Sequence, residues 1–415
     1  MNTYVFFTRR IDNIDGARQY IYSKSQYLET KGWRVLVFSG LQRPIHIKGL
    51  EKYKKYIIPS LLYSPRGSRR QAKSIIAKII EEIGDSRENQ CIIESGYFPS
   101  SLWAELVASK LNCRHLVFLL QETHRYNNKM TDFLRFKYNR HELAGIVKDS
   151  ICHILNDNTI EKREDSFIRA YANSIFDNCI DDYSELLNPS ANYTLASIGR
   201  LIKPCVPAII EGFCSYATLH PNMFFNVVMI GGSAYKGVKE AIQKKVGRYS
   251  NINLVLTGDI YPIPFGLIKK IDVFVSTAGS AVATYRACCP TIMVHPETGV
   301  PVGVIGLDFK TGEKTMYDSE KNLSIEGCIE RAIADRNKIE YTSGLEENYK
   351  EEIFAEYDRQ LSFVNGTNTN EYYDEKLLLN MRTPHLHYPF FHWVLEDILG
   401  AKGHQCVLAL IGKDL

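Results

Sequence analysis

Residues 272–281 read DVFVSTAGSA, an apolar stretch that runs directly into small residues able to begin a helix. The apolar part predicts a buried strand. The small residues at the predicted helix start are Thr277, Gly279, Ser280 and Ala281. Small side chains let a backbone approach an anion closely, and the amide hydrogens at a helix start point toward it. Because the same residue types also cap ordinary helices, the stretch predicts either a diphosphate-binding loop or a plain helix start.

The order of strand, loop and helix at residues 272–281 recurs along the 415-residue chain. In the first part, strand-like apolar runs cover residues 3–8, 33–39, 91–94, 115–120 and 151–155. In the second part, they cover residues 193–198, 224–230, 253–256, 272–276 and 291–294. Near-continuous apolar strands separated by helices are typical of doubly wound parallel sheets. We therefore predict an α/β protein with two doubly wound Rossmann-like domains that face a central cleft.

The alternation is interrupted by the Asn-Pro-Ser sequence at residues 188–190, where we place a domain boundary. The predicted N-terminal domain is residues 1–190, which would bind an acceptor. The predicted C-terminal domain is residues 191–362, which would bind a nucleotide-sugar. Residues 363–415 form a tail rich in aromatic and His residues. We expect this tail either to cross back onto the N-terminal domain or to form an appended helix and strand.

Composition excludes several classes of protein. With 45% hydrophobic and 23% charged residues, the chain is neither disordered nor fibrous. No apolar run reaches the roughly 18–20 residues of a membrane span, and the ten cysteines include no CxxC pair. We expect the cysteines to be free thiols in a cytoplasmic protein. The protein is either soluble or bound peripherally to the inner face of the cell membrane. The chain lacks GxSxG and Walker A motifs, and the pair His385 and His387 is too little to predict a bound metal.

Positive charge is concentrated near the N-terminus. Residues 1–80 hold 16 Lys and Arg residues against four Asp and Glu residues, although the net charge of the whole chain is +3. The excess within residues 48–78 predicts either a solvated face or a surface for anionic lipid or a phosphorylated substrate. Nucleic acid is not an expected partner, because stacking aromatic residues are not interleaved with the cations.

Ligands of doubly wound sheets bind beyond the carboxyl ends of the strands, so the loops at those ends supply the candidate residues. In the second domain, Arg200 and Lys203 follow the first strand. They would neutralise the charge on a departing nucleotide diphosphate, or they are two surface cations. Further candidates for binding the donor are Gly232, Ser233, Thr257, Gly258, His295 and Glu297.

The first domain has candidate residues in the loops after two of its strands. Gly16 stands at the head of a helix, where it could admit a phosphate of the donor. Asp15 beside it is either a helix cap or a carboxylate with a catalytic or acceptor-binding role. Glu122 and His124 follow the fourth strand, where either side chain could take a proton from an attacking hydroxyl group. His124 could equally be a structural histidine.

Taken together, these motifs resemble glycosyltransferases of the GT-B fold, and among them the large family 4 that builds bacterial surface polysaccharides. The resemblance covers residues 1–310. The motifs that carry it are Asp15-Gly16-Ala17, Lys31-Gly32-Trp33-Arg34-Val35, Ile198-Gly199-Arg200-Leu201, Met229-Ile230-Gly231-Gly232, residues 272–276 and Cys289-Pro290-Thr291-Ile292.

The resemblance implies that the second domain binds a nucleotide-sugar donor and the first a lipid-linked saccharide acceptor, in the biosynthesis of capsule, lipopolysaccharide or another surface polysaccharide. It implies a hexosyltransferase with no metal or other cofactor, in which the nucleotide-sugar is a co-substrate. Two alternatives stay open: a nucleotide-sugar epimerase of the same architecture, and a non-catalytic relative. The non-catalytic alternative is motivated by Ala283, which stands where the family carries a ribose-binding Glu. Cys205 likewise stands where the family carries a donor-binding Lys.

Overall fold

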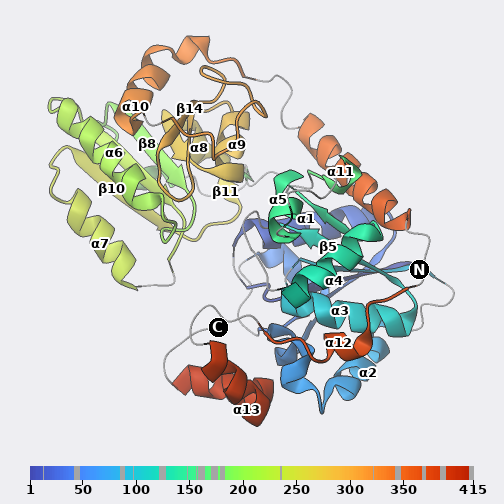
Figure 1. Cartoon of the computed structure of the whole chain (residues 1–415). Coiled ribbons are helices and arrows are strands. Elements are labelled where there is room, and N and C mark those ends of the chain that lie inside the picture. Colours follow the sequence, from blue (N-terminus) through green and yellow to red (C-terminus); the bar gives the residue numbers. More distant parts are fainter. Residues whose placement is uncertain are drawn as a thin grey trace. The chain divides into compact units, whose positions relative to one another are not determined.

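The computed structural model describes the chain as two compact units. The described residues are 1–415 without 13, 42–46, 85–88, 97, 121–127, 147, 156, 158–163, 170–175, 178–182, 234–235, 321, 342–346, 367–370, 384–388 and 411–415. Unit 1 comprises Met1–Asn173 together with Lys350–Leu415, and unit 2 comprises Ser174–Tyr349 (Figure 1). Both divisions fall earlier in the chain than the boundaries at 190 and 362 drawn from the sequence. Helix α11 (Glu347–Asn365) accounts for the second difference, because its side chains pack on unit 1.

Unit 1 is built on a six-stranded sheet in the order β3-β2-β1-β4-β5-β6, and every neighbouring pair is parallel. The strands are β1 (Thr3–Thr8), β2 (Arg34–Ser39), β3 (Lys54–Ile57), β4 (Cys91–Ser95), β5 (Arg114–Leu119) and β6 (Leu143–Gly145). The helices are α1 (Gly16–Thr30), η1 (Lys48–Lys52), η2 (Pro59–Leu62), η3 (Pro65–Ser68), α2 (Ala72–Ile83), α3 (Phe98–Leu111), α4 (Asn128–Asn139), α5 (Lys148–Leu155), η4 (Glu164–Ser166), α11, α12 (Glu375–Leu378) and α13 (Pro389–Leu410).

Alternate residues of β1 show how helices come to cover both faces of this sheet. Val5 and Phe7 point into a core shared with α2 and α3. Tyr4 and Phe6 point to the opposite face, where Lys24 of α1 lies over both rings. A strand buried on both faces needs no polar alternation, so β1 is apolar at nearly every position.

One strand expected from the sequence is a helix. Residues 151–155 form the end of α5, in which Ile151, Ile154 and Leu155 are buried. Their spacing of three and four residues matches one face of a helix, and a short apolar run does not distinguish a helix from a buried strand. The edge of the sheet next to β5 is filled by β6 instead.

Unit 2 repeats the architecture with the order β10-β9-β8-β12-β13-β14, parallel except for the antiparallel pair β13 and β14. The strands of this sheet are β8 (Tyr193–Ile198), β9 (Phe225–Ile230), β10 (Ile252–Gly258), β12 (Val273–Ser276), β13 (Thr291–Val294) and β14 (Pro301–Val304). Its helices are η5 (Ser184–Leu186), α6 (Val206–Leu219), α7 (Lys236–Val246), α8 (Phe265–Lys269), α9 (Ala278–Arg286), α10 (Ile325–Ala334) and η6 (Arg336–Lys338). A separate two-stranded pair joins β7 (Phe176–Asp177) to β11 (Ile263–Pro264).

In both units the chain adds its first three strands toward one edge of the sheet, and from the fourth strand on it adds them toward the other edge. In unit 2 the chain moves outward from β8 to β10 and then returns with β12 to the free side of β8. In unit 1 it moves outward from β1 to β3 and returns with β4 beside β1. The loops that leave the two central strands therefore diverge, which opens the crevice where such sheets bind ligands. The prediction of an α/β fold with two doubly wound Rossmann-like units is confirmed.

Candidate functional site

The start of α9 lies at the reversal point of unit 2. Thr277 leaves β12 with an extended backbone and is the N-cap residue of α9, but no capping hydrogen bond from its side chain is present in the described structure. Thr277 donates instead to the sulfur of Met316 at 3.8 Å. The first amide groups of a helix have no partner within it, so those of Gly279 and Ser280 are suited to an anion. The amide of Ala281, also predicted to bind the donor, is at the position that makes the first hydrogen bond within the helix, to the N-cap carbonyl. A Cβ built on Gly279 meets no atom within 4 Å, so the space beside this turn is open.

The loop after β8, which carries two cations, begins next to this helix start. Strands β8 and β12 are paired, and the Ile198 amide donates to Ser276 Oγ at 3.1 Å. Arg200 is exposed, and the Nζ atom of Lys203 lies 3.2 Å from the position of a Cβ built on Gly199. Burial lowers the pKa of Lys203, and the charge of Arg200 lowers it further. An ammonium group that has lost water and faces another cation gains from binding an anion.

The glycines after β9 are used by the fold itself. Gly231 has φ +140°, and a Cβ on it would lie 2.2 Å from the carbonyl oxygen of Gly199, so only glycine fits. The amide of Gly232 donates to Asp259 Oδ1 at 2.8 Å. Gly232 was predicted to bind the donor. In the structure its amide connects the loop after β9 to the loop after β10. Ser233 follows in the same loop, half-buried.

The loops after β10 and β13 hold the remaining candidates of unit 2. Thr257 donates its hydroxyl hydrogen to the carbonyl oxygen of Gly258 at 2.9 Å, at the end of β10. His295 accepts at Nδ1 from the amides of Glu297 at 3.2 Å and Thr298 at 3.3 Å. These two bonds place the ring hydrogen on Nε2, which makes the neutral imidazole a donor. Because β12 and β13 are neighbours, His295 follows the strand adjacent to the one that leads into α9.

Asp15 and Gly16 stand at the corresponding place in unit 1, after β1. Asp15 caps α1 by accepting from the Arg18 amide at 3.1 Å, and it pairs with the Arg18 guanidinium at 2.9 Å. The carboxylate is thus held as a helix cap. Gly16 is exposed, with open space where a side chain would be. Glu122 and His124 lie outside the described residues.

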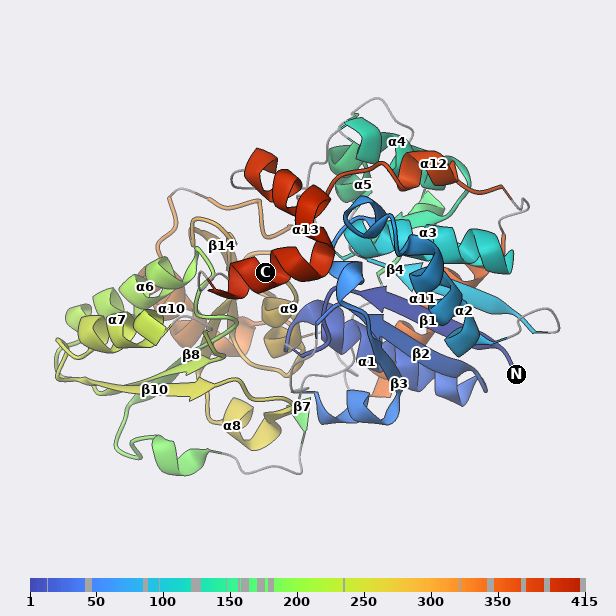
Figure 2. The same ribbon diagram turned by 90° about the horizontal axis from the view of Figure 1, so that it is seen from below.

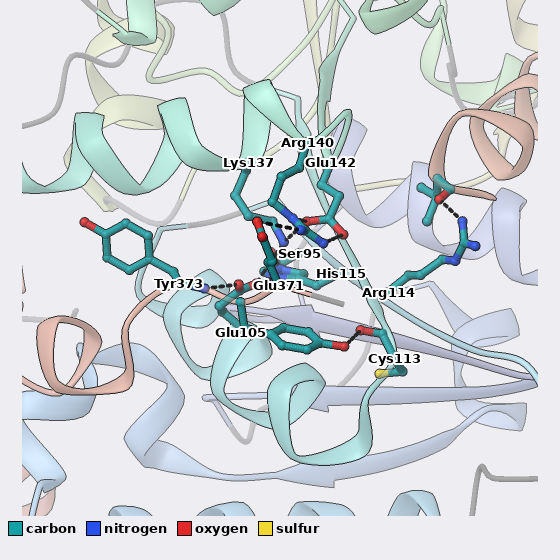
Figure 3. Close-up of polar contacts among 12 residues, drawn as sticks. Ser95, Glu105, Cys113, Arg114, His115, Lys137, Arg140, Glu142, Glu371 and Tyr373 are labelled. Atoms are coloured by element: carbon teal, nitrogen blue, oxygen red, sulfur yellow. Dashed lines mark hydrogen bonds and ion pairs between the residues drawn. The ribbon is translucent and has the colours of Figure 1, made fainter. Parts of the chain in front are cut away.

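A buried polar network in unit 1 was not anticipated. Glu105 of α3 lies at its centre, with Oε2 2.7 Å from His115 Nδ1 and 2.8 Å from Lys137 Nζ (Figure 3). Its other oxygen accepts from the backbone amide of Tyr373 at 3.0 Å. Ser95 Oγ lies 2.8 Å from His115 Nε2. Ser95, His115 and Glu105 are therefore hydrogen-bonded in the same order as the Ser-His-acid triad of serine hydrolases. These side chains are 1% exposed or less, so no substrate reaches them and the network stabilises the unit.

The charges of this network follow from its contacts. Burial alone would raise the pKa of Glu105, but Lys137 and His115 hold it below its usual value. Burial and Lys137 lower the pKa of His115. One feature of the sequence does point to the network, since Glu105 is the one acidic residue of α3 and, apart from Lys110 in the last turn, its neighbours in the helix are apolar or small.

A second buried cluster binds α11 to unit 1. Lys24 of α1 is fully buried and lies 2.5 Å from Glu94 of β4. Tyr20 donates to Glu94 Oε1 at 2.8 Å, and Gln360 of α11 donates to the Tyr20 hydroxyl at 2.9 Å. Burial lowers the pKa of Lys24 to about 8, although Glu94 opposes the shift. Glu94, the last residue of the strand-like run at 91–94, is therefore enclosed within the fold.

The described residues hold no group of three or more His, Cys, Asp or Glu side chains placed to bind a metal ion. Within the same residues, no helix combines the length and the apolar character needed to cross a membrane.

Comparison with known proteins identifies the fold. No protein-family model matches the chain, and no curated protein matches it. Among solved structures, HepE of Anabaena in complex with UDP and glucose superimposes with a TM-score of 0.60 at 13% identity, covering 88% of this chain and 99% of that one. A glycosyltransferase of Rickettsia africae gives 0.56 at 14% identity, covering 92% and 99%. The UDP-GlcNAc 2-epimerase of Neisseria meningitidis bound to UDP-GlcNAc gives 0.50 at 14% identity, covering 87% and 100%.

Proposed function

We propose that this protein is a glycosyltransferase that moves a hexosyl group from a UDP-sugar to a saccharide acceptor without a metal ion. The observation that carries the proposal is the start of α9, which lies next to the Arg200 and Lys203 loop at the reversal point of unit 2. The likeness of the fold to HepE in complex with UDP and glucose supports this reading.

The chemistry assigned to this site is stabilisation of a leaving diphosphate. In sugar transfer, the bond between the sugar and the diphosphate breaks, and negative charge develops on the departing oxygen. Arg200 and Lys203 would neutralise that charge, and the amide hydrogens of Gly279 and Ser280 would donate to the phosphate oxygens. This arrangement supplies the role that a divalent cation has in other transferases.

The loops beside the diphosphate site are assigned to the rest of the donor. His295 would donate from Nε2 to a sugar or phosphate oxygen, with Glu297 beside it. Thr257 and Gly258 would line the place of the base. Gly232 acts indirectly, because its amide is bound to Asp259.

Unit 1 is assigned to the acceptor. A hydroxyl group of the acceptor must lose its proton as it attacks, and Glu122 or His124 would take that proton. Asp15 is less suited to this role, because its carboxylate is paired with Arg18 and caps α1.

The acceptor is proposed to be lipid-linked, in the synthesis of a surface polysaccharide at the inner face of the cell membrane. The excess of cations in residues 48–78 supports an anionic membrane surface as the partner of unit 1.

Calorimetric titration with UDP tests the donor site. Arg200→Ala and Lys203→Met should each weaken UDP binding by about 10- to 100-fold, because each removes a charge-assisted contact. Arg248→Ala is the matched control, since Arg248 is an exposed cation beyond the end of α7. UDP binding that is unchanged in the Arg200→Ala and Lys203→Met double variant would overturn the site.

A second candidate function is epimerisation of a nucleotide-sugar, which the fold likeness to the epimerase of N. meningitidis favours. An epimerase converts the donor in the absence of any acceptor. Product analysis after incubation with UDP-GlcNAc or UDP-glucose alone separates the two functions, since a transferase leaves the sugar stereochemistry of the unreacted donor unchanged.

A further inference from the structure

The last helix of unit 1 has its apolar face outward. Helix α13 is interrupted at Gly400, whose backbone angles φ 70° and ψ 177° divide it into two helical pieces (Figure 2). In the first piece, Val394 and Ile398 follow Phe390 at intervals of four residues, so the three side chains share one helix face. Together with their neighbours they form an apolar stripe, defined by Phe390, Phe391, Val394, Ile398 and Leu399, which are 75%, 54%, 37%, 72% and 46% exposed.

Three described polar groups of the same helix point toward the body of unit 1. Glu396 is 4% exposed and accepts from the Thr383 hydroxyl at 3.0 Å. The indole of Trp393 donates to the carbonyl oxygen of Thr383 at 2.7 Å, and His404 Nδ1 lies 3.0 Å from the Tyr63 hydroxyl. A helix on the surface of a water-soluble domain has the opposite arrangement, with apolar side chains inward. These polar contacts hold the stripe in its outward orientation.

Cations follow the segment on which α13 packs. Helix α13 packs on η2 and η3, and a Cβ on Gly400 would lie 3.4 Å from the carbonyl oxygen of Gly67 in η3. The cationic border is defined as the exposed residues that follow η3, namely Arg69, Arg70, Lys73 and Lys78, together with Arg382. The Arg382 guanidinium lies 5.0 Å from the centre of the Trp393 ring. Residues 59–78 contain no Asp or Glu, so the positive charge is not balanced along this segment.

We propose that the apolar stripe of α13 inserts into the interface of an anionic lipid bilayer, with the cationic border on the lipid headgroups. Exposed Phe, Ile and Leu on one helix face beside Lys and Arg are the features of helices that lie in the plane of a membrane. A second copy of the chain is a poorer partner, because a two-fold interface would bring the two cationic borders together. The inference extends the membrane location proposed above and does not depend on sugar transfer.

Co-sedimentation of the full chain with vesicles tests the proposal. The vesicles contain phosphatidylcholine with phosphatidylglycerol, and vesicles of phosphatidylcholine alone provide the comparison. The triple variant Phe390→Ser, Phe391→Ser and Ile398→Ser should bind the mixed vesicles at least about 100-fold more weakly. Leu219→Ser, at a 66% exposed position of α6 in unit 2, is the matched control and should bind as the unchanged protein does.

The cationic border is tested separately by Arg70→Gln with Lys73→Gln. Binding to the mixed vesicles should fall about 25-fold, since one cation near an anionic surface contributes about fivefold. Lys244→Gln with Arg248→Gln, two exposed cations of unit 2, should have no effect. Circular dichroism and the thermal midpoint of each variant establish that it is folded.

The possible outcomes distinguish membrane insertion of the apolar stripe from dimerisation and from the proposed sugar transfer. Wild-type vesicle binding by the folded triple Ser variant would overturn the role of the apolar stripe, even if the Gln variants bind weakly. A dimer in light scattering that the triple Ser variant converts to a monomer would assign the stripe to a second copy and also overturn the proposal. Loss of UDP binding with vesicle binding intact would overturn the proposed transferase and leave this inference standing.

Discussion

The replacement of Glu105 by Gln should be among the most destabilising single changes in unit 1. Glu105 is fully buried and accepts from His115, Lys137 and the Tyr373 amide. Gln has nearly the same shape, so the change removes the charge while leaving little space unfilled. Lys137, which is 1% exposed, then keeps Glu142 as its carboxylate partner at 2.6 Å but loses Glu105.

The size of the effect follows from the burial of the charges. Removing one partner from a buried ion pair costs about 3–5 kcal/mol when the other charge stays out of water without compensation. Because Lys137 keeps Glu142, the lower end of this range, about 3 kcal/mol, applies. For a unit of this length, 1 kcal/mol shifts the midpoint of thermal unfolding by about 2–4 °C. We therefore expect Glu105→Gln to lower the midpoint of unit 1 by about 6–12 °C.

The assay is urea and thermal unfolding followed by circular dichroism. Glu371→Gln is the matched control, because Glu371 reaches the same network through Arg140 at 3.9 Å but is 77% exposed on its side chain. An exposed ion pair contributes about 0–1 kcal/mol, so this control should unfold close to the unchanged protein. Equal midpoints for Glu105→Gln and Glu371→Gln would refute the reasoning.

The same network predicts the pH dependence of stability. The folded-state pKa values of Glu105 and His115 both lie below their ordinary values. A lowered pKa means that the unfolded chain binds more protons, so stability is lost as the pH falls. Unfolding free energy should decrease from about pH 7.5 to about pH 5.5, where unfolded His115 becomes protonated. In His115→Gln, the decrease should be smaller.

Three further substitutions test two glycines and one helix cap. Gly231→Ala should lower the unfolding free energy of unit 2 by roughly several kcal/mol, because the added Cβ would clash with the Gly199 carbonyl oxygen. Gly237 on α7 has open space beside it, so Gly237→Ala should instead raise the unfolding free energy, measured in urea, by about 0.5–1 kcal/mol. Asp15→Ala should cost about 1 kcal/mol through loss of the α1 cap to Arg18. Unchanged unfolding of Asp15→Ala would show that the cap contributes nothing.

Local sequence patterns were sufficient for the architecture. The strands at residues 272–276 and 291–294 are short apolar runs bounded by small or turn residues, and they were predicted within a residue of their observed ends. Periodicity and turn residues act over a few neighbours, so they can be read without the fold. Where the local signal was ambiguous, as at residues 151–155, the helix α5 replaced the predicted strand.

The pairing of distant charges required the tertiary structure. Lys24, Glu94 and Gln360 are far apart in the chain, and each taken alone is a polar residue expected at the surface. Only the return of α11 to unit 1 buries them together. In the same way, the sequence by itself identified α9 as a possible anion-binding helix start, but the pairing of β8 with β12 decided that the loop carrying Arg200 and Lys203 begins next to it. Sequence specifies local backbone preferences, whereas proximity between loops depends on the order of strands in the sheet.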